Sequence, residues 1–420
     1  MAAINESLER IGADAKKAAS VVGLLCADEK NRALEACADE LKADSGVILE
    51  ANAKDMDAAR KNGLKGAFLE RLTLNEKRLS QMASGLREIA ALPDPVGEIS
   101  SMKPAKNGLL IGKMATPIGV IGVIYESRPN VTSDAFGLCF KAGSGVILRG
   151  GSEAVCSNEA ITAAFQRVLA RIGLPPCAVS LLADTSRETA AQFMRLDKYV
   201  DVLIPRGGAG LIRAVVENST IPVIETGVGN CHIYVDESAD IAMAIDIIVN
   251  AKTDRPGVCN ACEKVLIHEA VVEGVLPALA GRLFSAGVEI RGDGRLAGLV
   301  PEIKPAEESD WDEEYLDLII AMRAVKDIGE AIGHINARST KHSESIITGS
   351  YDNAQRFLRE VDSAAVYVNA STRFTDGNEF GLGAEIGIST QKLHARGPIG
   401  LRELVSEKYV IYGSGQLRNA

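Results

Sequence analysis

The residues with the clearest chemical potential lie in the segment Asp254-Arg255-Pro256-Gly257-Val258-Cys259-Asn260-Ala261-Cys262. The Pro-Gly break before Cys259 and the apolar run Val265–Ile267 after it predict a loop above a scaffold, where catalytic groups tend to sit. An ordinary cysteine is only about 3% thiolate at neutral pH, and the charges of Lys252 and Arg255 would raise that fraction. The pattern alone also fits a cysteine that is a small buried hydrophobic residue, so the role of Cys259 must be judged from the rest of the chain.

The pair Cys259-x-x-Cys262 also fits zinc binding or dithiol redox chemistry. The chain has no second such pair, and its five histidines lack zinc-finger spacing, so we expect no metal site. The other cysteines mostly lie inside apolar segments, which predicts reduced thiols in a reducing compartment; they are Cys26, Cys37, Cys139, Cys156, Cys177 and Cys231.

Length and charge limit the kinds of partner that this chain can have. Its 420 residues, 46% of them hydrophobic, can bury large cores and predict two or three domains. The net charge of −10 argues against nucleic acid or an anionic membrane, because phosphate binding needs a basic surface. The N-terminus lacks a signal-peptide pattern and no apolar run is long enough to span a bilayer, so we expect a soluble, cytoplasmic protein.

The chain opens with helical periodicity, and near residue 117 it changes to alternating strand and helix patterns. Helices are expected at about 152–171, 186–196 and 208–217. The apolar β-branched runs expected as strands are Val120–Ile124, Val146–Leu148, Val179–Leu182, Val200–Ile204, Val223–Ile224 and Ile233–Val235. Such alternation of buried strands and helices indicates a parallel sheet covered on both faces.

A second series of the same kind follows the 239–251 helix and the Cys259 loop. Its expected strands are Val265–Ile267, Leu318–Val325, Ser345–Thr348 and Ala365–Asn369, with helices near 270–286, 327–337 and 352–361. Two series predict an α/β fold with two parallel-sheet domains and a cleft between them, which the Cys259 loop would face. The acidic stretch 302–317 is expected to be a solvated connector.

The chain's end adds a strand that needs a partner. Leu404–Tyr412 alternates apolar and polar residues, and Leu109–Ala115 is an equally isolated strand candidate. We expect the two to form a small β arm, over 106–116 and 396–420, that mediates oligomerisation. The expected domains are then 1–105 with 117–228 for nucleotide binding, and 229–370 for catalysis.

Two strand-to-helix turns have the makings of a nucleotide site. One contains Arg149, Gly150, Gly151, Ser152 and Glu153, and the other contains Arg206, Gly207 and Gly208. Each combines glycines, an arginine and a helix N-terminus, which is where phosphates bind. Neither has the G-x-G-x-x-G spacing of a Rossmann site. Arg149 would suit the 2′-phosphate of NADP, because guanidinium groups match phosphate in a bidentate way.

Four segments together resemble the aldehyde dehydrogenase superfamily: 117–130 (PIGVIGVIYESRPN), 146–154 (VILRGGSEA), 223–230 (VIETGVGN) and 256–263 (PGVCNACE). The segment 331–346 (AIGHINARSTKHSESI) is similar to the signature of the branch that reduces gamma-glutamyl phosphate, except that Arg338 stands where His or Tyr is usual. The resemblance covers essentially the whole chain and implies an aldehyde dehydrogenase-like fold.

Several site residues follow from this resemblance by position. Cys259 would be the nucleophile, Glu225 the general base or a structural residue, and Asn130 the oxyanion donor, although ungapped alignment places Glu126 there. Arg149 would replace the lysine that binds the adenosine ribose, and Glu314 would bind the nicotinamide ribose. The candidate substrate-binding cations are Arg128, Arg255, Lys341, His342 and Arg373.

The resemblance implies NADPH-dependent reduction of L-glutamyl 5-phosphate to L-glutamate 5-semialdehyde and phosphate through a thioester on Cys259, a step of proline biosynthesis. It further implies a homo-oligomer and glutamate 5-kinase as a candidate partner. Three alternatives stay open. They are a hydrolytic NAD(P)-dependent aldehyde dehydrogenase, which Glu225 allows, a non-catalytic scaffold that keeps the fold, and a redox or metal protein that uses Cys259 and Cys262 together.

Overall fold

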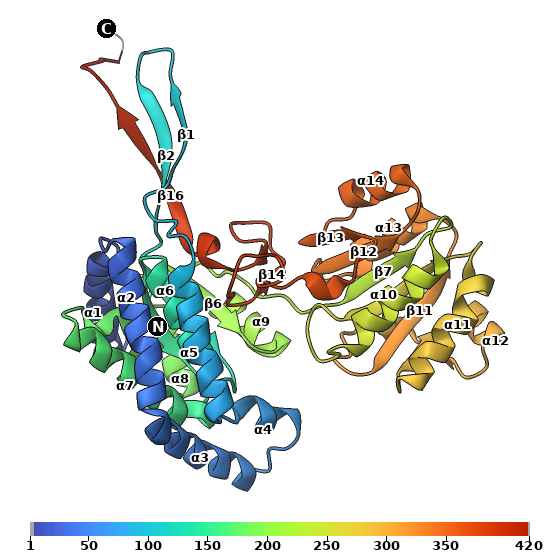
Figure 1. Ribbon diagram of the computed structural model, residues 1–420, viewed down its shortest axis with the longest axis horizontal. Helices are drawn as coiled ribbons and strands as arrows, with labels where there is room; N and C mark the ends of the chain where they lie inside the picture. The colour runs from blue at the N-terminus through green and yellow to red at the C-terminus, as the bar shows by residue number, and fades with distance from the viewer. Residues whose placement is uncertain (1–3, 419–420) are drawn as a thin grey trace. The chain divides into compact units, whose positions relative to one another are not determined.

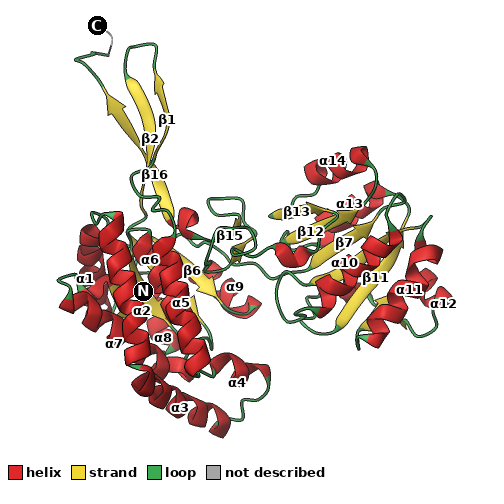
Figure 2. Cartoon of the chain, in the orientation of Figure 1, coloured by secondary structure: helices red, strands yellow, loops and turns green. Residues whose placement is uncertain are grey.

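The strands expected between residues 117 and 206 form a four-stranded parallel sheet in the computed structural model, which describes residues 4–418 (Figures 1 and 2). The strand order is β5-β4-β3-β6. The bounds are β3 (Val120–Tyr125), β4 (Gly145–Arg149), β5 (Val179–Leu181) and β6 (Val202–Arg206). Every residue of β3 is buried, as the continuous apolar run predicts for a strand covered on both faces. Val223–Ile224 makes only an isolated bridge from Val223 to Leu203, so the strand expected there is wrong.

Helices cover this sheet. Together with the arm described below, they complete the first unit, which consists of the chain up to Glu225, the segment Gly381–Gly387 and the residues from Ile399 on. Side-chain caps fix several helix starts: Asn5 accepts from Ser7 N and Asn75 accepts from Arg78 N. The helices are α1 (Glu6–Val22), α2 (Ala27–Ala43), α3 (Ser45–Lys61), α4 (Ala67–Leu72), α5 (Glu76–Ala91), α6 (Asn130–Lys141), α7 (Val155–Arg171), α8 (Arg187–Phe193) and α9 (Ala209–Asn218).

The arm is a three-stranded antiparallel sheet with the order β1-β2-β16 (Figure 1). The expected pairing of the last strand is confirmed, because β16 (Val405–Tyr412) pairs with β2 (Leu110–Pro117) from Val405↔Pro117 to Tyr412↔Leu110. The third strand, β1 (Ile99–Pro104), was not expected, because its sequence is mostly polar and ends in proline. Residues 419–420 of the predicted arm and residues 1–3 of the predicted first domain lie outside the described residues. The role of the arm in oligomerisation stays a prediction.

The second unit comprises Thr226–Phe380 and Ile388–Pro398 and contains a seven-stranded parallel sheet. The strand order is β10-β9-β11-β8-β7-β12-β13, with bounds β7 (Cys231–Val235), β8 (Cys262–His268), β9 (Glu289–Gly292), β10 (Lys304–Pro305), β11 (Ile319–Val325), β12 (Ser343–Ile347) and β13 (Ala365–Val368). Its helices are α10 (Ile241–Thr253), α11 (Val272–Ser285), α12 (Gly294–Leu299), α13 (Ile328–Arg338) and α14 (Tyr351–Glu360). A short hairpin of β14 (Ile388–Ser389) and β15 (Gly397–Pro398) completes it.

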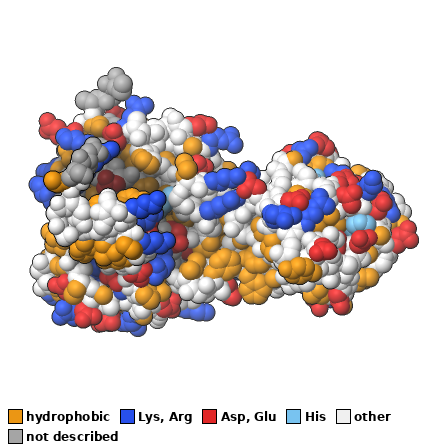
Figure 3. Space-filling model, turned by 90° about the horizontal axis from the view of Figure 1, so that it is seen from above, with side chains coloured by type: hydrophobic (Ala, Val, Ile, Leu, Met, Phe, Trp, Pro, Cys, Tyr) orange, Lys and Arg blue, Asp and Glu red, His pale blue; other side chains and the backbone are white. Residues whose placement is uncertain are grey.

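The acidic stretch 302–317 is only in part the solvated connector that we expected: most of its residues are exposed, but Ile303, Asp310 and Trp311 are buried. Trp311 is only 7% exposed, and Asp310 is buried between Arg291 at 2.6 Å and the Tyr315 hydroxyl at 2.7 Å. Asp310 pairs with Arg291, and Glu308 and Asp312 pair with Arg338, which composition alone does not reveal. On the face in Figure 3, acidic and basic side chains are intermixed over this unit. No helix among the described residues is long and apolar enough to cross a membrane.

Candidate active site

Cys259 lies on the loop between α10 and β8, at the edge of the second sheet where its strands begin. A Cβ atom on Gly229 would lie 1.4 Å from the Cys259 carbonyl oxygen and 2.7 Å from its Cα. The backbone of Cys259 therefore rests directly on Gly229, two residues ahead of β7. The thiol of Cys231, the first residue of β7, donates to the same carbonyl oxygen at 3.1 Å. Cys259 itself is partly exposed, whereas Cys231 and Cys262 are buried.

The neighbouring Asn260 is held from several sides by the segment Ser371–Thr375. Its side-chain amide donates to the carbonyl oxygens of Arg373 at 3.2 Å and Thr375 at 2.9 Å, while Arg373 Nη1 donates to its Oδ1. The Thr372 hydroxyl donates to the Asn260 carbonyl at 2.7 Å. Arg373 also pairs with Asp254 at 3.1 Å, which joins the start of the loop to the same segment. These contacts fix the backbone immediately after Cys259.

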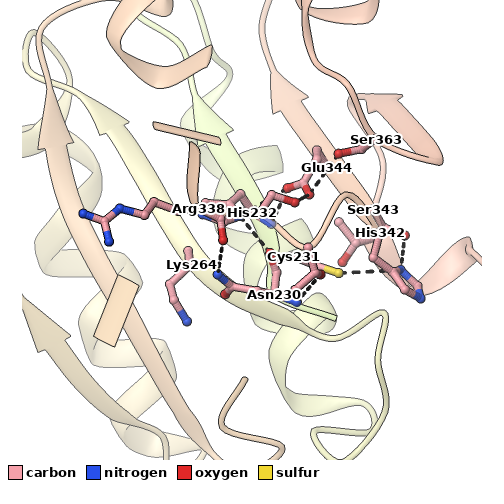
Figure 4. Close-up of polar contacts among 12 residues, drawn as sticks. Asn230, Cys231, His232, Lys264, Arg338, His342, Ser343, Glu344 and Ser363 are labelled. Atoms are coloured by element: carbon pink, nitrogen blue, oxygen red, sulfur yellow. Dashed lines mark hydrogen bonds and ion pairs between the residues drawn. The ribbon is translucent and has the colours of Figure 1, made fainter. Parts of the chain in front are cut away.

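A chain of polar side chains leads from Cys231 through His342 to Ser343 (Figure 4). Cys231 Sγ lies 3.8 Å from His342 Nδ1, which lies 2.8 Å from Ser343 Oγ. Ser343 Oγ lies 2.6 Å from Thr375 Oγ1, so this chain ends in the segment that holds Asn260. His342 is fully buried in it. Burial makes a positioning role the better interpretation of His342, in place of the expected direct substrate contact.

A fully buried ion pair closes the base of the loop. Lys252 Nζ in the last turn of α10 lies 3.0 Å from Glu263 Oε2 in β8, and neither side chain is exposed. Burial raises the pKa of Glu263 to about 7, and Lys252 opposes that rise. Burial also lowers the pKa of Lys264 to about 8. The Lys252–Glu263 pair thus joins the two ends of the Cys259 loop.

Glu314 lies beside the same loop. Its Oε1 accepts a hydrogen bond from Gly229 N at 2.6 Å, and burial raises the pKa of its carboxyl group. The next residue, Asn230, donates from its side chain to Trp311 O and Arg338 O at 2.9 and 3.0 Å. The stretch around Glu314 therefore packs against the residues that support Cys259. Contact of Glu314 with a ribose stays a prediction.

Cys259 and Cys262 differ in ways that argue against a joint metal or dithiol site. The Cys262 side chain is buried, its thiol donates to Lys264 O at 3.2 Å, and burial raises its pKa to about 12. A thiol in that state is a poor nucleophile or ligand at neutral pH. Within residues 4–418, no group of three or more His, Cys, Asp and Glu side chains is placed to hold a metal ion.

In the first unit, the two predicted nucleotide turns lie at the carboxyl ends of β4 and β6, on either side of β3. Arg149 Nη2 donates to Thr185 O at 2.6 Å, and its Nε is buried without a partner among the described residues. A Cβ on Gly150 would lie 2.2 Å from Asn158 Nδ2, so a larger residue there would have to displace this buried side chain. A guanidinium nitrogen without a partner, beside a glycine that keeps the backbone accessible, fits a phosphate-bearing ligand.

Two carboxylates tie these turns to the end of β3. Glu153 Oε1 accepts from Ser127 N at 2.8 Å and Ser127 Oγ at 2.6 Å. Glu126 Oε2 accepts from Gly208 N at 2.9 Å, and the backbone of Glu126 bonds to the Arg206 carbonyl at 3.2 Å. Glu153 and Glu126 therefore order the site's backbone. The cofactor contact expected of Glu153 stays a prediction.

The remaining predicted residues lie as follows. Asn130 begins α6, is exposed, and donates to Asp134 Oδ2 at 3.0 Å, while burial raises the pKa of Asp134 to about 6. Arg255 is exposed and Arg128 is half-buried. Lys341 pairs with Asp362 at 3.2 Å. Glu225, at the end of the first unit, is half-buried; the roles assigned to these residues stay predictions. Ser152, Gly207 and Gly208 line the turns as their sequence positions imply.

Sequence reasoning named Lys252 only as a charge near Cys259 and Arg373 only as a substrate cation. It missed the contacts that support Cys259, which involve Gly229, Asn260, the Lys252–Glu263 pair and the segment Ser371–Thr375. Asn260 carried a signal, because a polar amide directly after a candidate nucleophile needs partners if the loop packs down. The close approach of Gly229 carried none, since its neighbour lies thirty residues on in the chain.

Comparison with known proteins places this architecture. The model of the aldehyde dehydrogenase family matches residues 1–291. The chain is 56% identical over 413 residues to a protein of Lachnospira eligens named gamma-glutamyl phosphate reductase, covering 98% of this chain and 100% of the relative. It is 58% identical over 404 residues to the protein of that name from Thermoanaerobacter pseudethanolicus, covering 96% and 98%.

Solved structures give the same result. The crystal structure of gamma-glutamyl phosphate reductase from Thermotoga maritima superposes with a TM-score of 0.97 at 48% identity, covering 99% of this chain and 100% of that one. An acetylating aldehyde dehydrogenase from Geobacillus thermoglucosidasius shares the fold, with a TM-score of 0.70 at 19% identity over 99% of this chain and 98% of that one.

Proposed function

Because this chain belongs to the gamma-glutamyl phosphate reductases of the aldehyde dehydrogenase family, we propose that it performs their reaction with Cys259 as the nucleophile. It is an oxidoreductase that reduces L-glutamyl 5-phosphate to L-glutamate 5-semialdehyde with NADPH, a step of proline biosynthesis. The observation that carries the assignment to Cys259 is its position: a partly exposed thiol on a loop that Gly229 and Asn260 hold in place.

The proposed chemistry begins when the Cys259 thiolate attacks the acyl carbon. The carbon–sulfur bond forms, the acyl–oxygen bond breaks, and phosphate leaves, so that a γ-glutamyl thioester remains. NADPH, when bound, supplies the hydride that reduces this carbon to the aldehyde level, after which the thiol is released. Asn260 does not act as an oxyanion donor in this scheme, because its amide already donates to two carbonyl oxygens. Asn130 stays our candidate oxyanion donor. Its side-chain amide carries two hydrogens, and the bond to Asp134 uses one of them, which leaves the second for the oxyanion.

The residues of the two turns fit an NADPH site. Arg149, with its unpartnered Nε, would meet the 2′-phosphate, and Gly150, Ser152, Gly207 and Gly208 would let the phosphates approach the backbone. Arg206 is the second cation of this edge, and Glu314 would receive the nicotinamide ribose. Glu126 and Glu153 hold the turns in shape for this purpose.

Further parts of the proposal concern the substrate and partners. Arg128, Arg255 and Arg373 are the remaining candidate cations for the acyl phosphate, and Glu225 is proposed either for proton transfer or for structure. We further propose a cytoplasmic homo-oligomer that pairs through the β1-β2-β16 sheet and receives its labile substrate from glutamate 5-kinase.

The oxidative direction tests the function. With glutamate 5-semialdehyde and NADP+, the protein should reduce NADP+ over repeated turnovers only when inorganic phosphate is supplied, because phosphate must take the acyl group from the thioester. Sustained turnover without phosphate would instead indicate thioester hydrolysis and support a hydrolytic aldehyde dehydrogenase.

A further inference from the structure

Three cationic side chains surround one carboxylate near the amino ends of the strands of the second sheet, where the Cys259 loop also lies. Lys392 Nζ lies 2.8 Å and Lys341 Nζ 3.2 Å from Asp362 Oδ2, while Arg396 Nη2 lies 2.9 Å from Asp362 Oδ1. Within the cluster the three cations outnumber the one carboxylate by two, in a chain whose net charge is −10. The Lys392 and Arg396 contacts, with Lys341, hold the pKa of Asp362 well below its usual range.

Two features distinguish this cluster from a chance surface network. Lys341 has φ 65°, in the left-handed region that a non-glycine residue enters only when its surroundings enforce it. Its backbone is fixed there by Ser339 Oγ, which accepts from Lys341 N at 2.8 Å, and by Ala364 N, which donates to Lys341 O at 2.9 Å. In addition, Arg396 Nε is buried without a hydrogen-bond partner among the described residues.

Strand register places the cluster relative to Cys259. Cys262 of β8 aligns with Cys231 of β7, and the next pairings along, Glu344 with His232 and Ser343 with Ala365, continue this row into β12 and β13. Lys341 precedes β12 by two residues, and Asp362 precedes β13 by three. Since Cys259 rests on the entry to β7, the cluster lies one to two strands away, which is roughly 5–10 Å along the edge.

That distance matches the length of a glutamyl chain. From its acyl carbon to its α-carboxylate carbon the extended chain spans roughly 5 Å, and contacts of about 3 Å extend its reach to roughly 8 Å. An α-amino acid carries a carboxylate and an ammonium on one carbon. A carboxylate ringed by cations is complementary to that pair, because the cations meet the carboxylate and Asp362 meets the ammonium.

We propose that Lys341, Asp362, Lys392 and Arg396 form the subsite that binds the α-amino-acid end of the substrate while its acyl end lies at Cys259. The inference rests on the proposed function and assigns three residues, Asp362, Lys392 and Arg396, that neither the motifs nor the family comparison singled out. A phosphate group lacks the ammonium that would pair with Asp362, so the cluster matches the α-amino-acid end better than the acyl phosphate.

The test uses the oxidative direction, in which semialdehyde and phosphate are separate substrates with separate KM values. Lys392→Gln, Arg396→Gln and Asp362→Asn should each raise the KM for glutamate 5-semialdehyde about tenfold, the loss expected for one charge-assisted hydrogen bond. The KM for phosphate and the rate at which iodoacetamide alkylates Cys259 should stay at wild-type values. Arg356→Gln, which breaks a comparable pair with Glu360 on α14, is the matched control and should change none of them.

The outcomes separate the possibilities. An unchanged KM for semialdehyde overturns the proposal, and so does a raised KM for phosphate in its place. Alkylation of Cys259 that slows in proportion to activity also overturns it, because such slowing would mean that the substitution damages the Cys259 loop. Tighter semialdehyde binding by Asp362→Asn would overturn the ammonium contact. Lys392 is 63% exposed in its side chain, so Lys392→Gln keeps the test usable if another variant does not fold. Failure of the proposed function itself shows separately, as wild-type turnover that needs no phosphate.

Discussion

Gly229 lies so close beneath Cys259 that a Cβ atom at this position would overlap the Cys259 carbonyl oxygen at 1.4 Å. The overlap is with backbone, so it cannot be relieved by a rotamer change, and the Cys259 loop would have to lift. We therefore expect Gly229→Ala to reduce kcat/KM by about 100-fold, the effect of misplacing a reacting group by roughly 1 Å.

Gly257→Ala is the control in the same loop, because its Cβ would meet only Leu316 O at an ordinary 3.6 Å. Steady-state kinetics of both variants make the comparison. Equal losses in the two would mean that any change in this loop is harmful, and would remove the special role of Gly229.

Asn260 provides a second check on how Cys259 is positioned. Asn260→Ala removes the donors to Arg373 O and Thr375 O, so that the loop keeps only its bonds through Thr372 and Asp254 to the segment Ser371–Thr375. We expect kcat to fall by about 10- to 100-fold with little change in KM, because the lost contacts position the nucleophile and do not bind substrate. The pH dependence of Cys259 alkylation by iodoacetamide should change with it.

Asn218→Ala, which loses only a local bond to Ala214 O on α9, should behave as wild type. If Asn260→Ala raised KM and left both kcat and the alkylation profile unaltered, Asn260 would be a substrate ligand.

The Lys252–Glu263 pair should be important for stability. Lys252→Met leaves the fully buried Glu263 without its ion-pair partner, which typically costs about 3–5 kcal/mol. We expect a large drop in the denaturant midpoint of the second unit, and substantial recovery in the double variant Lys252→Met/Glu263→Gln, which no longer buries a charge. A double variant as unstable as the single one would show that packing, and not charge, explains the loss.

His334 should make the protein sensitive to mild acid. Burial lowers the pKa of His334 from 6.5 to about 3, next to the Arg323 guanidinium at 3.3 Å. Above pH 6.5 neither state binds the proton, so His334 contributes nothing to the pH dependence. Below it the unfolded chain takes up a proton that the folded protein does not, so stability falls as the pH drops toward 3.

His334→Gln keeps an acceptor for Arg323 but cannot titrate. Relative to wild type it should gain about 1 kcal/mol in unfolding free energy between pH 7.5 and 5.5. Chemical denaturation at the two pH values measures this difference. Parallel pH profiles for both proteins would mean that the pKa of His334 is the same in the folded and the unfolded state.

Much of the fold could be predicted because short stretches of the sequence determine many of its elements. Continuous apolar runs such as Val120–Ile124 have one stable place, inside a covered parallel sheet, and β3 lies there with every residue buried. The pairing of β16 with β2 followed from two lone strand candidates that needed partners. β1 was not predicted, because its pairing with β2, and not its own polar sequence, makes it a strand.

The site was predictable only in part, for the same reason. Cys259 and the glycine turns have local signatures, whereas the ion pair of Lys252 and Glu263 and the Asp362 cluster are brought together by topology. His342 shows the limit clearly. A motif suggested substrate contact, but the fold buries this side chain behind the loop.

The most direct test of the central claim is a rapid-mixing experiment without phosphate. Excess glutamate 5-semialdehyde and NADP+ are added, and NADPH formation is followed in wild type, Cys259→Ala and Cys262→Ala, with folding checked by circular dichroism. A covalent intermediate on Cys259 predicts a burst of NADPH stoichiometric with enzyme in wild type and in Cys262→Ala, and none in Cys259→Ala. A burst that survives in Cys259→Ala, or disappears only in Cys262→Ala, would contradict the assignment.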